Sequence, residues 1–243
     1  MNAAHRHCSD ARQNQLLAAL PAAEWGRWQP HLEVVDLRFG QVLCDSGTTP
    51  AYAYFPTTAV VSLLNLSQDG GSTEVAVVGN DGVVGLSLFM GGNPMTSQAM
   101  VQSAGQGYRL CAHTMKNEVK RAGPVLSLLL RYTQAVFAQV AQTALCNRYH
   151  SIDQQLCRRL LLGLDRLPSD ELLMTQELVA NLLGVRREGV TAAALKLQQA
   201  GVIRYSRGHI AVLDRPRLEQ RTCECYAASR KEYGRLLPMP LAA

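Results

Sequence analysis

The most constraining stretch of the sequence, Leu173 to Leu213, carries the punctuation of two short helices, a tight turn and a hairpin. Thr175 can cap the first helix, and acidic Glu177 suits the positive end of its dipole. Gly184 follows the last apolar position, where a glycine adopts the left-handed conformation without steric cost. A second helix is predicted to begin near Arg186. This pattern is typical of a helix-turn-helix, whose second helix lies in the major groove of DNA.

An ordinary helical hairpin without a nucleic-acid partner would share this spacing, so the chemistry of the second helix has to decide. Arginine can bind guanine through two hydrogen bonds, and glutamate can accept one from cytosine N4. The predicted exposed first turns of this helix offer both, and we expect base readout from Arg186, Arg187, Glu188 and Thr191.

Beyond the second helix, two apolar runs flank the predicted three-residue turn Ser206-Arg207-Gly208 and indicate a β-hairpin. A hairpin beside the second helix makes a winged helix. We expect DNA phosphate contacts from Thr175, Gln176, Lys196, Arg204, Arg207 and His209.

The run G-V-R-R-E-G-V-T at residues 184–191, followed by L-Q-Q-A-G-V-I, resembles the DNA-binding domain of the Crp/Fnr transcription regulators, the family of the cyclic-AMP receptor protein. The arginine–glutamate pair of that family falls on Arg187 and Glu188. Two positions depart from the pattern: Arg186 stands where a serine or threonine cap is common, and Ala192 where several members have another base-reading arginine. The resemblance therefore implies DNA binding but does not carry over an operator sequence.

The positive charge of the chain is concentrated in its C-terminal part. Residues 1–146 contain nine Lys+Arg and nine Asp+Glu, whereas residues 147–243 contain fifteen and ten, so the whole excess of +5 lies with the helix-turn-helix. This distribution suits a polyanionic partner at that end.

The N-terminal half changes from a lead-in helix, which ends near Pro30, to short strands separated by turns, as in a sandwich or barrel-like roll. The runs R-F-G-Q-V-L-C-D-S-G-T and V-G-N-D-G-V-V-G-L-S-L-F resemble turns of the cyclic-nucleotide-binding β-roll that precedes the Crp/Fnr DNA-binding domain. The expected strands are Leu32–Leu37, Gln41–Leu43, Tyr52–Phe55, Val60–Leu66, Thr73–Val78, Val83–Leu86, Met100–Ala104 and Tyr108–Cys111.

The phosphate cassette of that roll is altered here. Family members that bind cyclic AMP have a glutamate after the glycine that matches Gly85, and an Arg-Ser or Arg-Thr pair after the next turn. This chain has Leu86 and then Thr96-Ser97-Gln98-Ala99, with no Lys or Arg between Arg38 and Arg109. A buried phosphate needs a charge-assisted contact, so we expect no tight cyclic-AMP binding. An effector pocket, for an effector of unknown identity, is assigned to Gly85, Leu86, Ser97 and Gln98.

A long helix without an internal breaker is predicted from Pro124 to about Asn147, with two adjacent apolar stripes. One stripe can pack on the roll, and the other needs a second subunit unless the helix is buried wholly within one chain. The resemblance implies a homodimer paired along this helix. The expected interface is Leu128, Leu129, Tyr132, Val136 and Val140; the neighbouring stripe is Leu126, Leu130, Thr133, Phe137 and Ala141.

The expected fold is α+β. A β-roll with an N-terminal helix spans residues 1–123, a dimerisation helix 124–147, a winged helix-turn-helix 148–214 and a helical tail 215–243. A capping box at Ser151–Gln154 starts a helix that runs to Arg166, so a hinge is expected at Asn147–His150. The tail is expected to be one helix from Pro216 to Pro238, which braces the domain or contacts the roll.

Cysteine and histidine residues are expected to form neither an iron–sulfur, haem nor other metal site. Cys8 lacks companions for a cluster, and His5 and His7 beside it belong to a frayed terminus. Cys223 and Cys225 point about 200° apart on a helix and make a poor chelate without outside ligands. The isolated cysteines are expected to be small core residues: Cys44, Cys111, Cys146 and Cys157. The other histidines follow no ligand spacing: His31, His113, His150 and His209.

No catalytic motif is found, so we expect a transcription regulator that is not an enzyme. No signal-peptide core or membrane segment is found either, so we expect the protein to be cytoplasmic. Its expected partners are double-stranded DNA with a palindromic operator, a second copy of the chain, a small-molecule effector and RNA polymerase. Two alternatives remain open. One is a redox- or metal-responsive regulator, and the other is a nucleotide-sensing module that binds a protein partner and not DNA.

Overall fold

Short β-branched and apolar runs between residues 33 and 111 form a roll of two antiparallel sheets in the computed structural model, which describes residues 10–91, 94–167 and 170–237. One sheet has the order β1-β7-β3 and the other β2-β6-β4-β5. Phe55, Val61 and Leu110 are among the residues buried in the core of this part of the chain. The strands are β1 (Glu33–Leu37), β2 (Val42–Cys44), β3 (Tyr52–Pro56), β4 (Val60–Leu66), β5 (Ser72–Val78), β6 (Gln98–Ser103) and β7 (Gly105–Cys111).

Seven of the eight expected strands are confirmed to within a few residues, but Val83–Leu86 is not a strand. Val84 makes one antiparallel bridge with Tyr54, and the chain then turns at Gly85 into the short helix α3 (Ser87–Met90). Extended pairing stops there because the carbonyl of Gly85 already accepts the first helical hydrogen bond, from the amide of Leu88.

The expected lead-in helix is divided into short pieces, because Pro21 lies between two of them and Asn14 caps another. The buried Asn14 accepts hydrogen bonds from the amides of Leu16 and Leu17 and donates to the carbonyls of Pro56 and Gly82, so it fixes the lead-in to the roll. The pieces are η1 (Ala11–Gln13), α1 (Gln15–Ala18), α2 (Ala22–Trp28) and η2 (Gln29–His31). The expectations for His5, His7 and Cys8 lie outside the described residues.

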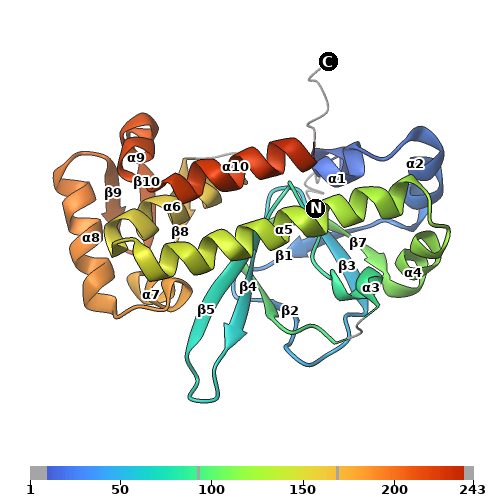
Figure 1. The fold of residues 1–243 in the computed structure, drawn as a ribbon, viewed down its shortest axis with the longest axis horizontal. Coiled ribbons are helices and arrows are strands. Elements are labelled where there is room, and N and C mark those ends of the chain that lie inside the picture. Colours follow the sequence, from blue (N-terminus) through green and yellow to red (C-terminus); the bar gives the residue numbers. More distant parts are fainter. Residues whose placement is uncertain (1–9, 92–93, 168–169, 238–243) are drawn as a thin grey trace, which may run out of the picture.

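Helix α5 (Pro124–Tyr149) follows the short α4 (Ala112–Lys120) and crosses the whole molecule (Figure 1). Its buried face packs on the roll: Gln139 accepts a hydrogen bond from the amide of Val77, and Tyr132 donates one to the carbonyl of Val83. The helix continues two residues beyond the expected end, so the break before the next helix is at His150 and Ser151.

Our assignment of one apolar stripe of α5 to the dimer interface is wrong. Leu128, Leu129, Tyr132 and Val136 are buried inside the chain, and Val140 is half-buried, because these residues are the ones that meet the roll. The large exposed apolar residues of α5 are instead Leu130, Phe137, Leu145 and Tyr149.

The C-terminal unit has its own core around α6 (Ile152–Leu164), α7 (Gln176–Leu183) and α8 (Arg187–Gln199). The Ser151–Gln154 capping box that starts α6 is confirmed. Strands β9 (Ile203–Ser206) and β10 (His209–Val212) form the expected hairpin, and β8 (Glu171–Leu173), which we did not expect, completes a sheet of order β8-β10-β9.

The tail is not one helix but two, α9 (Arg215–Arg221) and α10 (Glu224–Leu236), separated at Thr222 and Cys223. Both of these residues have extended backbone conformations, with ψ angles of 172° and 167°. Helix α10 lies along α5 (Figure 1) and does not pack beside the wing, and its end joins the core of the roll through Leu236. The tail therefore links both halves of the molecule.

Two buried ion pairs fix α6 and the residues after it to the roll. Arg159 Nε lies 2.6 Å from Glu74 Oε1 on β5, and Arg166 Nη2 lies 2.7 Å from Asp81 Oδ2 in the turn after β5. Burial raises the pKa of Glu74, and the Arg159 guanidinium offsets only part of that increase. Burying this pair costs desolvation free energy, and removing either partner would leave an unpaired charge in the core.

Within the described ranges, none of the helices has both the length and the apolar character required to cross a lipid bilayer.

Candidate nucleic-acid interface

Local capping sets the geometry of the helix-turn-helix. The Thr175 hydroxyl accepts a hydrogen bond from the amide of Leu178 at 3.1 Å, so it caps α7 as expected. Gly184 ends α7 with φ 65° in the left-handed region, and the amide of Val185 donates to the carbonyl of Ala180. Helix α8 then begins at Arg187, with Arg186 as a capping residue that provides no side-chain hydrogen bond.

Apolar burial orients α8 so that its polar face is exposed. Val190, Ala193, Ala194 and Leu197 pack inward against α6 and α7. Arg186, Arg187, Glu188 and Thr191 are exposed, as the sequence predicts for residues that read base edges.

The wing is held beside α8 by Tyr205 and Gln198. The amide of Tyr205 donates to Gln198 Oε1 at 3.2 Å, and the Tyr205 hydroxyl donates to the carbonyl of Met174 at 2.9 Å. Sequence reasoning missed both positioning residues, because their partners lie in other elements. The loop at the wing tip contains only Arg207 and Gly208, with φ 49° and 82°, and not the three residues we expected. Positive φ at both positions is the signature of a type I′ turn.

A groove of about 360 Å³ lies between α8, the start of α7 and the wing. At its edge the Thr191 hydroxyl donates to Gln176 Oε1 at 2.8 Å and so connects the two helices. The expected DNA contacts that line the groove are Thr175, Gln176, Arg187, Thr191 and Arg207. Arg204 and His209 are exposed on the two strands of the wing.

Lys196 does not belong to this face, which contradicts our assignment of a phosphate contact. It lies nine residues after Arg187, about two and a half helical turns, and therefore on the opposite side of α8. Its Nζ lies 2.8 Å from Asp153 Oδ2 on α6.

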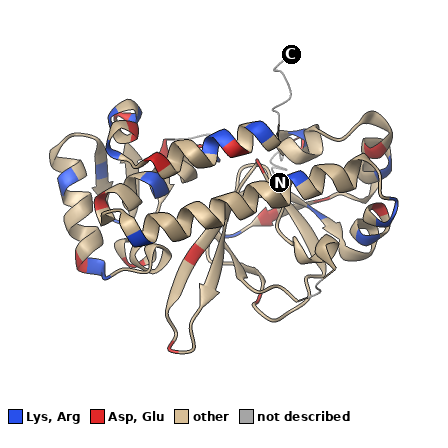
Figure 2. Cartoon of the chain, in the orientation of Figure 1, with Lys and Arg blue, Asp and Glu red and all other residues tan. Residues whose placement is uncertain are grey.

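The charge distribution favours the same end of the molecule. Figure 2 shows Lys and Arg on α8, α9 and α10, whereas strands β4 and β5 of the roll carry a single charged residue, Glu74.

The expected effector residues lie in two parts of the roll. Ser97 donates a hydrogen bond to Asn65 Oδ1 at 2.7 Å, and Gln98 donates one to Asp45 Oδ1 at 2.8 Å. Gly85 and Leu86 precede α3, where Leu86 packs against the core of the roll. The effector pocket stays a prediction.

Comparison with known proteins identifies the C-terminal unit. Residues 154–221 match the Crp-like helix-turn-helix domain family. No curated protein sequence matches the chain.

Solved structures share the fold over most of the chain. A Crp/Fnr-family protein of Eubacterium rectale is 21% identical, with 86% of this chain and 98% of that chain covered and a TM-score of 0.65. FixK2 of Bradyrhizobium japonicum is 17% identical, with coverages of 79% and 98% and a TM-score of 0.66. A Crp/Fnr-family transcriptional regulator of Thermus thermophilus is 20% identical, with coverages of 77% and 97% and a TM-score of 0.62. The TM-scores establish a common fold, and at identities this low the similarity extends to the fold alone.

Proposed function

The chain carries a Crp-like helix-turn-helix domain at residues 154–221 within the fold of Crp/Fnr regulators, and we propose that it is a homodimeric, sequence-specific DNA-binding transcription regulator. The observation that supports this proposal best is the exposed face formed by the first turns of α8 and the wing tip. Arg187 and Arg207 line one groove there, and Glu188 is exposed beside Arg187.

Each part of this face has a distinct role in the proposal. Helix α8 enters the major groove, where Arg187 and Glu188 contact base edges. Arg204, Arg207 and His209 of the wing contact phosphates, which adds affinity without sequence preference.

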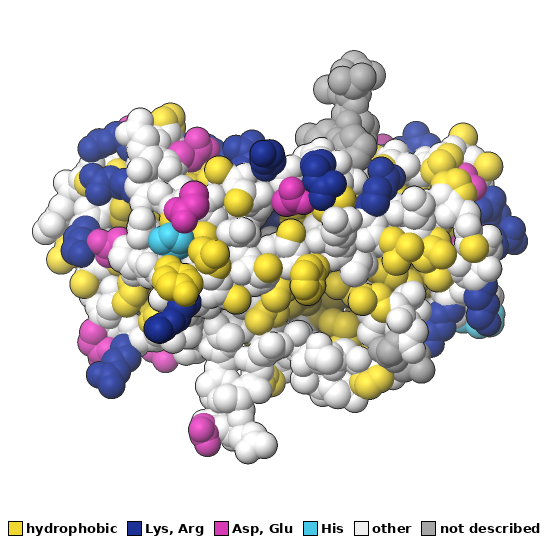
Figure 3. All heavy atoms as spheres, viewed as in Figure 1, with side chains coloured by type: hydrophobic (Ala, Val, Ile, Leu, Met, Phe, Trp, Pro, Cys, Tyr) yellow, Lys and Arg dark blue, Asp and Glu magenta, His cyan; other side chains and the backbone are white. Residues whose placement is uncertain are grey.

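A second copy of the chain is proposed to pair along α5. Phe137 is 73% exposed and Leu130 53% exposed on this helix, and Leu145 and Tyr149 extend the apolar face toward its C-terminal end. Figure 3 shows hydrophobic side chains gathered along the middle of this side of the molecule, where α5 runs. An apolar helix face of this kind is stabilised when a two-fold mate covers it.

The roll is proposed to sense an effector other than a cyclic mononucleotide bound in the usual way. No Lys or Arg lies between Arg38 and Arg109, and Arg109 is already paired with Glu33 at 2.7 Å and stacked over Tyr52. Calorimetry with cyclic AMP is therefore expected to show no binding at micromolar concentration, and micromolar affinity would contradict this part of the proposal.

DNA recognition is tested by selecting bound sequences from random duplex DNA with the purified full chain. We expect a roughly palindromic motif with half-sites about 34 Å apart. The logarithm of the affinity should fall linearly with the logarithm of salt concentration as phosphate counterions are released. A helix-turn-helix that only packs against protein would instead leave every duplex unbound at low ionic strength, with or without cell extract, and the proposal would then be wrong.

A further inference from the structure

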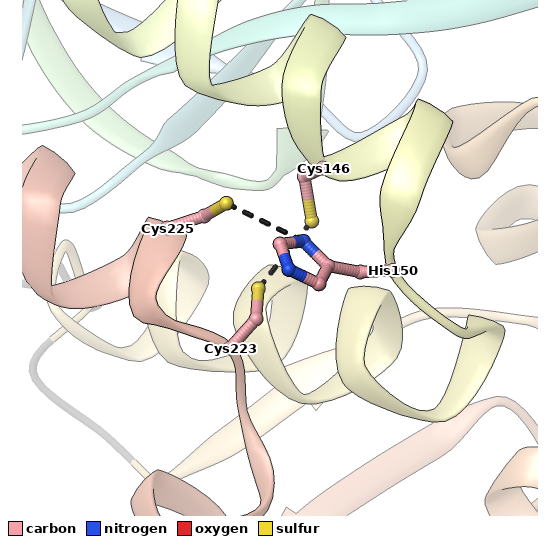
Figure 4. A group of neighbouring side chains, drawn as sticks. All are labelled: Cys146, His150, Cys223 and Cys225. Atoms are coloured by element: carbon pink, nitrogen blue, oxygen red, sulfur yellow. Dashed lines mark hydrogen bonds between the residues drawn. The ribbon is translucent and has the colours of Figure 1, made fainter.

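Three cysteines and a histidine from distant parts of the chain converge at the junction between α5 and the tail (Figure 4). Cys146 and His150 come from the C-terminal end of α5, and Cys223 and Cys225 from the start of α10. One ligand atom from each residue can be chosen so that all four lie within 4.8 Å of one another. The three cysteines are buried and His150 is nearly so.

We propose that Cys146, His150, Cys223 and Cys225 bind one Zn²⁺ ion that fixes the tail to the end of α5. Three sulfurs and one imidazole nitrogen are a ligand set that a structural zinc ion takes in tetrahedral geometry. This proposal does not depend on DNA binding.

The distances fit that geometry. Zinc bonds of about 2.3 Å to sulfur and about 2.0 Å to nitrogen place tetrahedral ligand atoms about 3.5–3.8 Å apart. Cys146 Sγ and Cys223 Sγ are 3.5 Å apart, as are Cys225 Sγ and His150 Nδ1. No two of the four ligand atoms are more than 4.8 Å apart, so small movements of the side chains would bring all four around one ion.

The second ring nitrogen of His150 supports the same assignment. Its Nε2 lies 3.2 Å from Glu224 Oε1, and a carboxylate that accepts a hydrogen bond from Nε2–H keeps the proton on that nitrogen, so that the Nδ1 lone pair is directed at the sulfurs. Metal-binding histidines almost always have such a partner.

The charge of the site is also compensated. Three thiolates and Zn²⁺ leave one net negative charge, and Arg158 is a buried cation close enough to interact with two of the sulfurs.

Two spacings in the sequence point to this cluster. Cys146 and His150 are four residues apart and so share one side of the end of α5, and Cys223 and Cys225 are the only C-x-C pair. We expected the latter two on opposite sides of a helix, but Cys223 precedes α10 with φ −91° and ψ 167°, which lets both sulfurs face α5. Cys146 is buried, as expected of a core cysteine, but it is not isolated, because its sulfur lies 3.5 Å from that of Cys223. The core assignment is wrong for Cys111, which is exposed.

Metal content of the full chain, purified without a histidine tag or chelator, gives the first test. We expect about one zinc per chain. Cys223→Ser and Cys146→Ser should reduce the content to less than about a tenth of that value, whereas Cys111→Ser, a matched cysteine removal on the roll, should retain it. A wild-type protein that contains no zinc and takes up none after reduction would overturn the proposal.

Two further measurements keep the test independent of whether the cysteine variants fold. Co²⁺ added to the reduced, metal-free wild type should produce the intense visible bands of a tetrahedral sulfur-rich site. Glu224→Gln, at a residue whose side chain is 75% exposed, should weaken metal affinity about 10- to 100-fold. Unchanged affinity in Glu224→Gln together with absent cobalt bands would refute the assignment.

Chelation of the wild type should lower its Tm by about 5 °C or more, because the ion binds the folded chain and not the unfolded one. Cys223→Ser should show no such shift. Iron with acid-labile sulfide in protein purified without oxygen would contradict the zinc site and indicate an iron–sulfur cluster. A Cys146–Cys223 disulfide in the same material would also contradict it and indicate redox chemistry.

Discussion

Arg187 and Lys196 show that the position of a residue around its helix decides whether its side chain lies on the proposed DNA-binding face. Both are cations of α8, and both were expected to contact DNA from their sequence. Only Arg187 lines the groove beside the wing, whereas Lys196 is paired with Asp153 on the opposite side. A charge count along a helix does not separate these two cases, but the helical period does.

Replacing Arg187 by Ala is expected to cost about 1–3 kcal/mol of binding free energy at one base pair, and to relax specificity at that position. Lys196→Ala is the matched control, since it removes a cation from the same helix but from the side that faces α6. It should change affinity by less than about 0.5 kcal/mol. Affinities for the selected operator and its single-base variants, measured by fluorescence anisotropy at constant salt, compare the two. Equal losses in both variants would show that the groove is not the base-reading face.

Arg207→Asn separates charge from conformation at the wing tip. Asparagine accepts the positive φ of 49° more readily than arginine and suits a type I′ turn, so the stability of the fold should be unchanged or slightly higher. DNA affinity should nevertheless fall by a similar factor for all sequences, and the slope of log affinity against log salt should decrease by about one. Thermal unfolding and salt titrations measure the two effects. A loss restricted to one operator would instead indicate base contact.

Residues whose role is local could be predicted from the sequence. The Thr175 cap, the left-handed Gly184 and the Ser151–Gln154 capping box depend on neighbours within a few positions, and all three are confirmed. Tyr205 could not be assigned in the same way, because its hydroxyl meets a carbonyl 31 residues away. The same holds for the cysteines and histidine of the proposed zinc site.

At the scale of elements, the two apolar stripes of α5 were found but given the wrong partners. Periodicity shows that a helix has two apolar faces, yet it does not say which of them meets the roll. The structure places Tyr132 against the roll and leaves Phe137 exposed. The tail was likewise predicted as helical, but the break at Thr222 and Cys223 has no glycine or proline to announce it.

Phe137→Glu should therefore dissociate the proposed dimer, because a charge would be buried in an apolar contact. Size-exclusion chromatography with light scattering at micromolar concentration is expected to give a monomer of about half the wild-type mass, with weaker binding to a palindromic site. Phe39→Glu serves as control, since Phe39 is an equally large exposed residue on the roll. A wild type that is already monomeric, or a Phe137→Glu dimer, would exclude pairing along this face.

At the scale of the whole molecule, the relative placement of the two halves rests on contacts that no local pattern reveals. Glu74 and Arg159 are 85 residues apart, as are Asp81 and Arg166, and each pair joins the roll to the unit that carries α8. The fold class and the order of the elements followed from periodicity, turns and the family resemblance. The docking of the two halves could not be predicted in this way, because the sequence does not distinguish a buried carboxylate from an exposed one.

Arg159→Met tests this docking, since it removes the cation and leaves Glu74 buried. Breaking a buried pair in this way is expected to cost about 3–5 kcal/mol in the free energy of unfolding. The double variant Glu74→Gln, Arg159→Met should recover most of that loss, because no unpaired charge remains.

The pH dependence should distinguish the two variants. Without Arg159, the pKa of Glu74 in the folded chain lies further above its unfolded value, so the folded state binds a proton that the unfolded state has lost. The stability of Arg159→Met should therefore fall as pH rises through the interval between the two values and recover as pH is lowered. Urea unfolding across that interval should give no such slope for the double variant. Parallel pH profiles for the two would mean that Glu74 is hydrated in the single variant, and that α6 separates from the roll once the ion pair is lost.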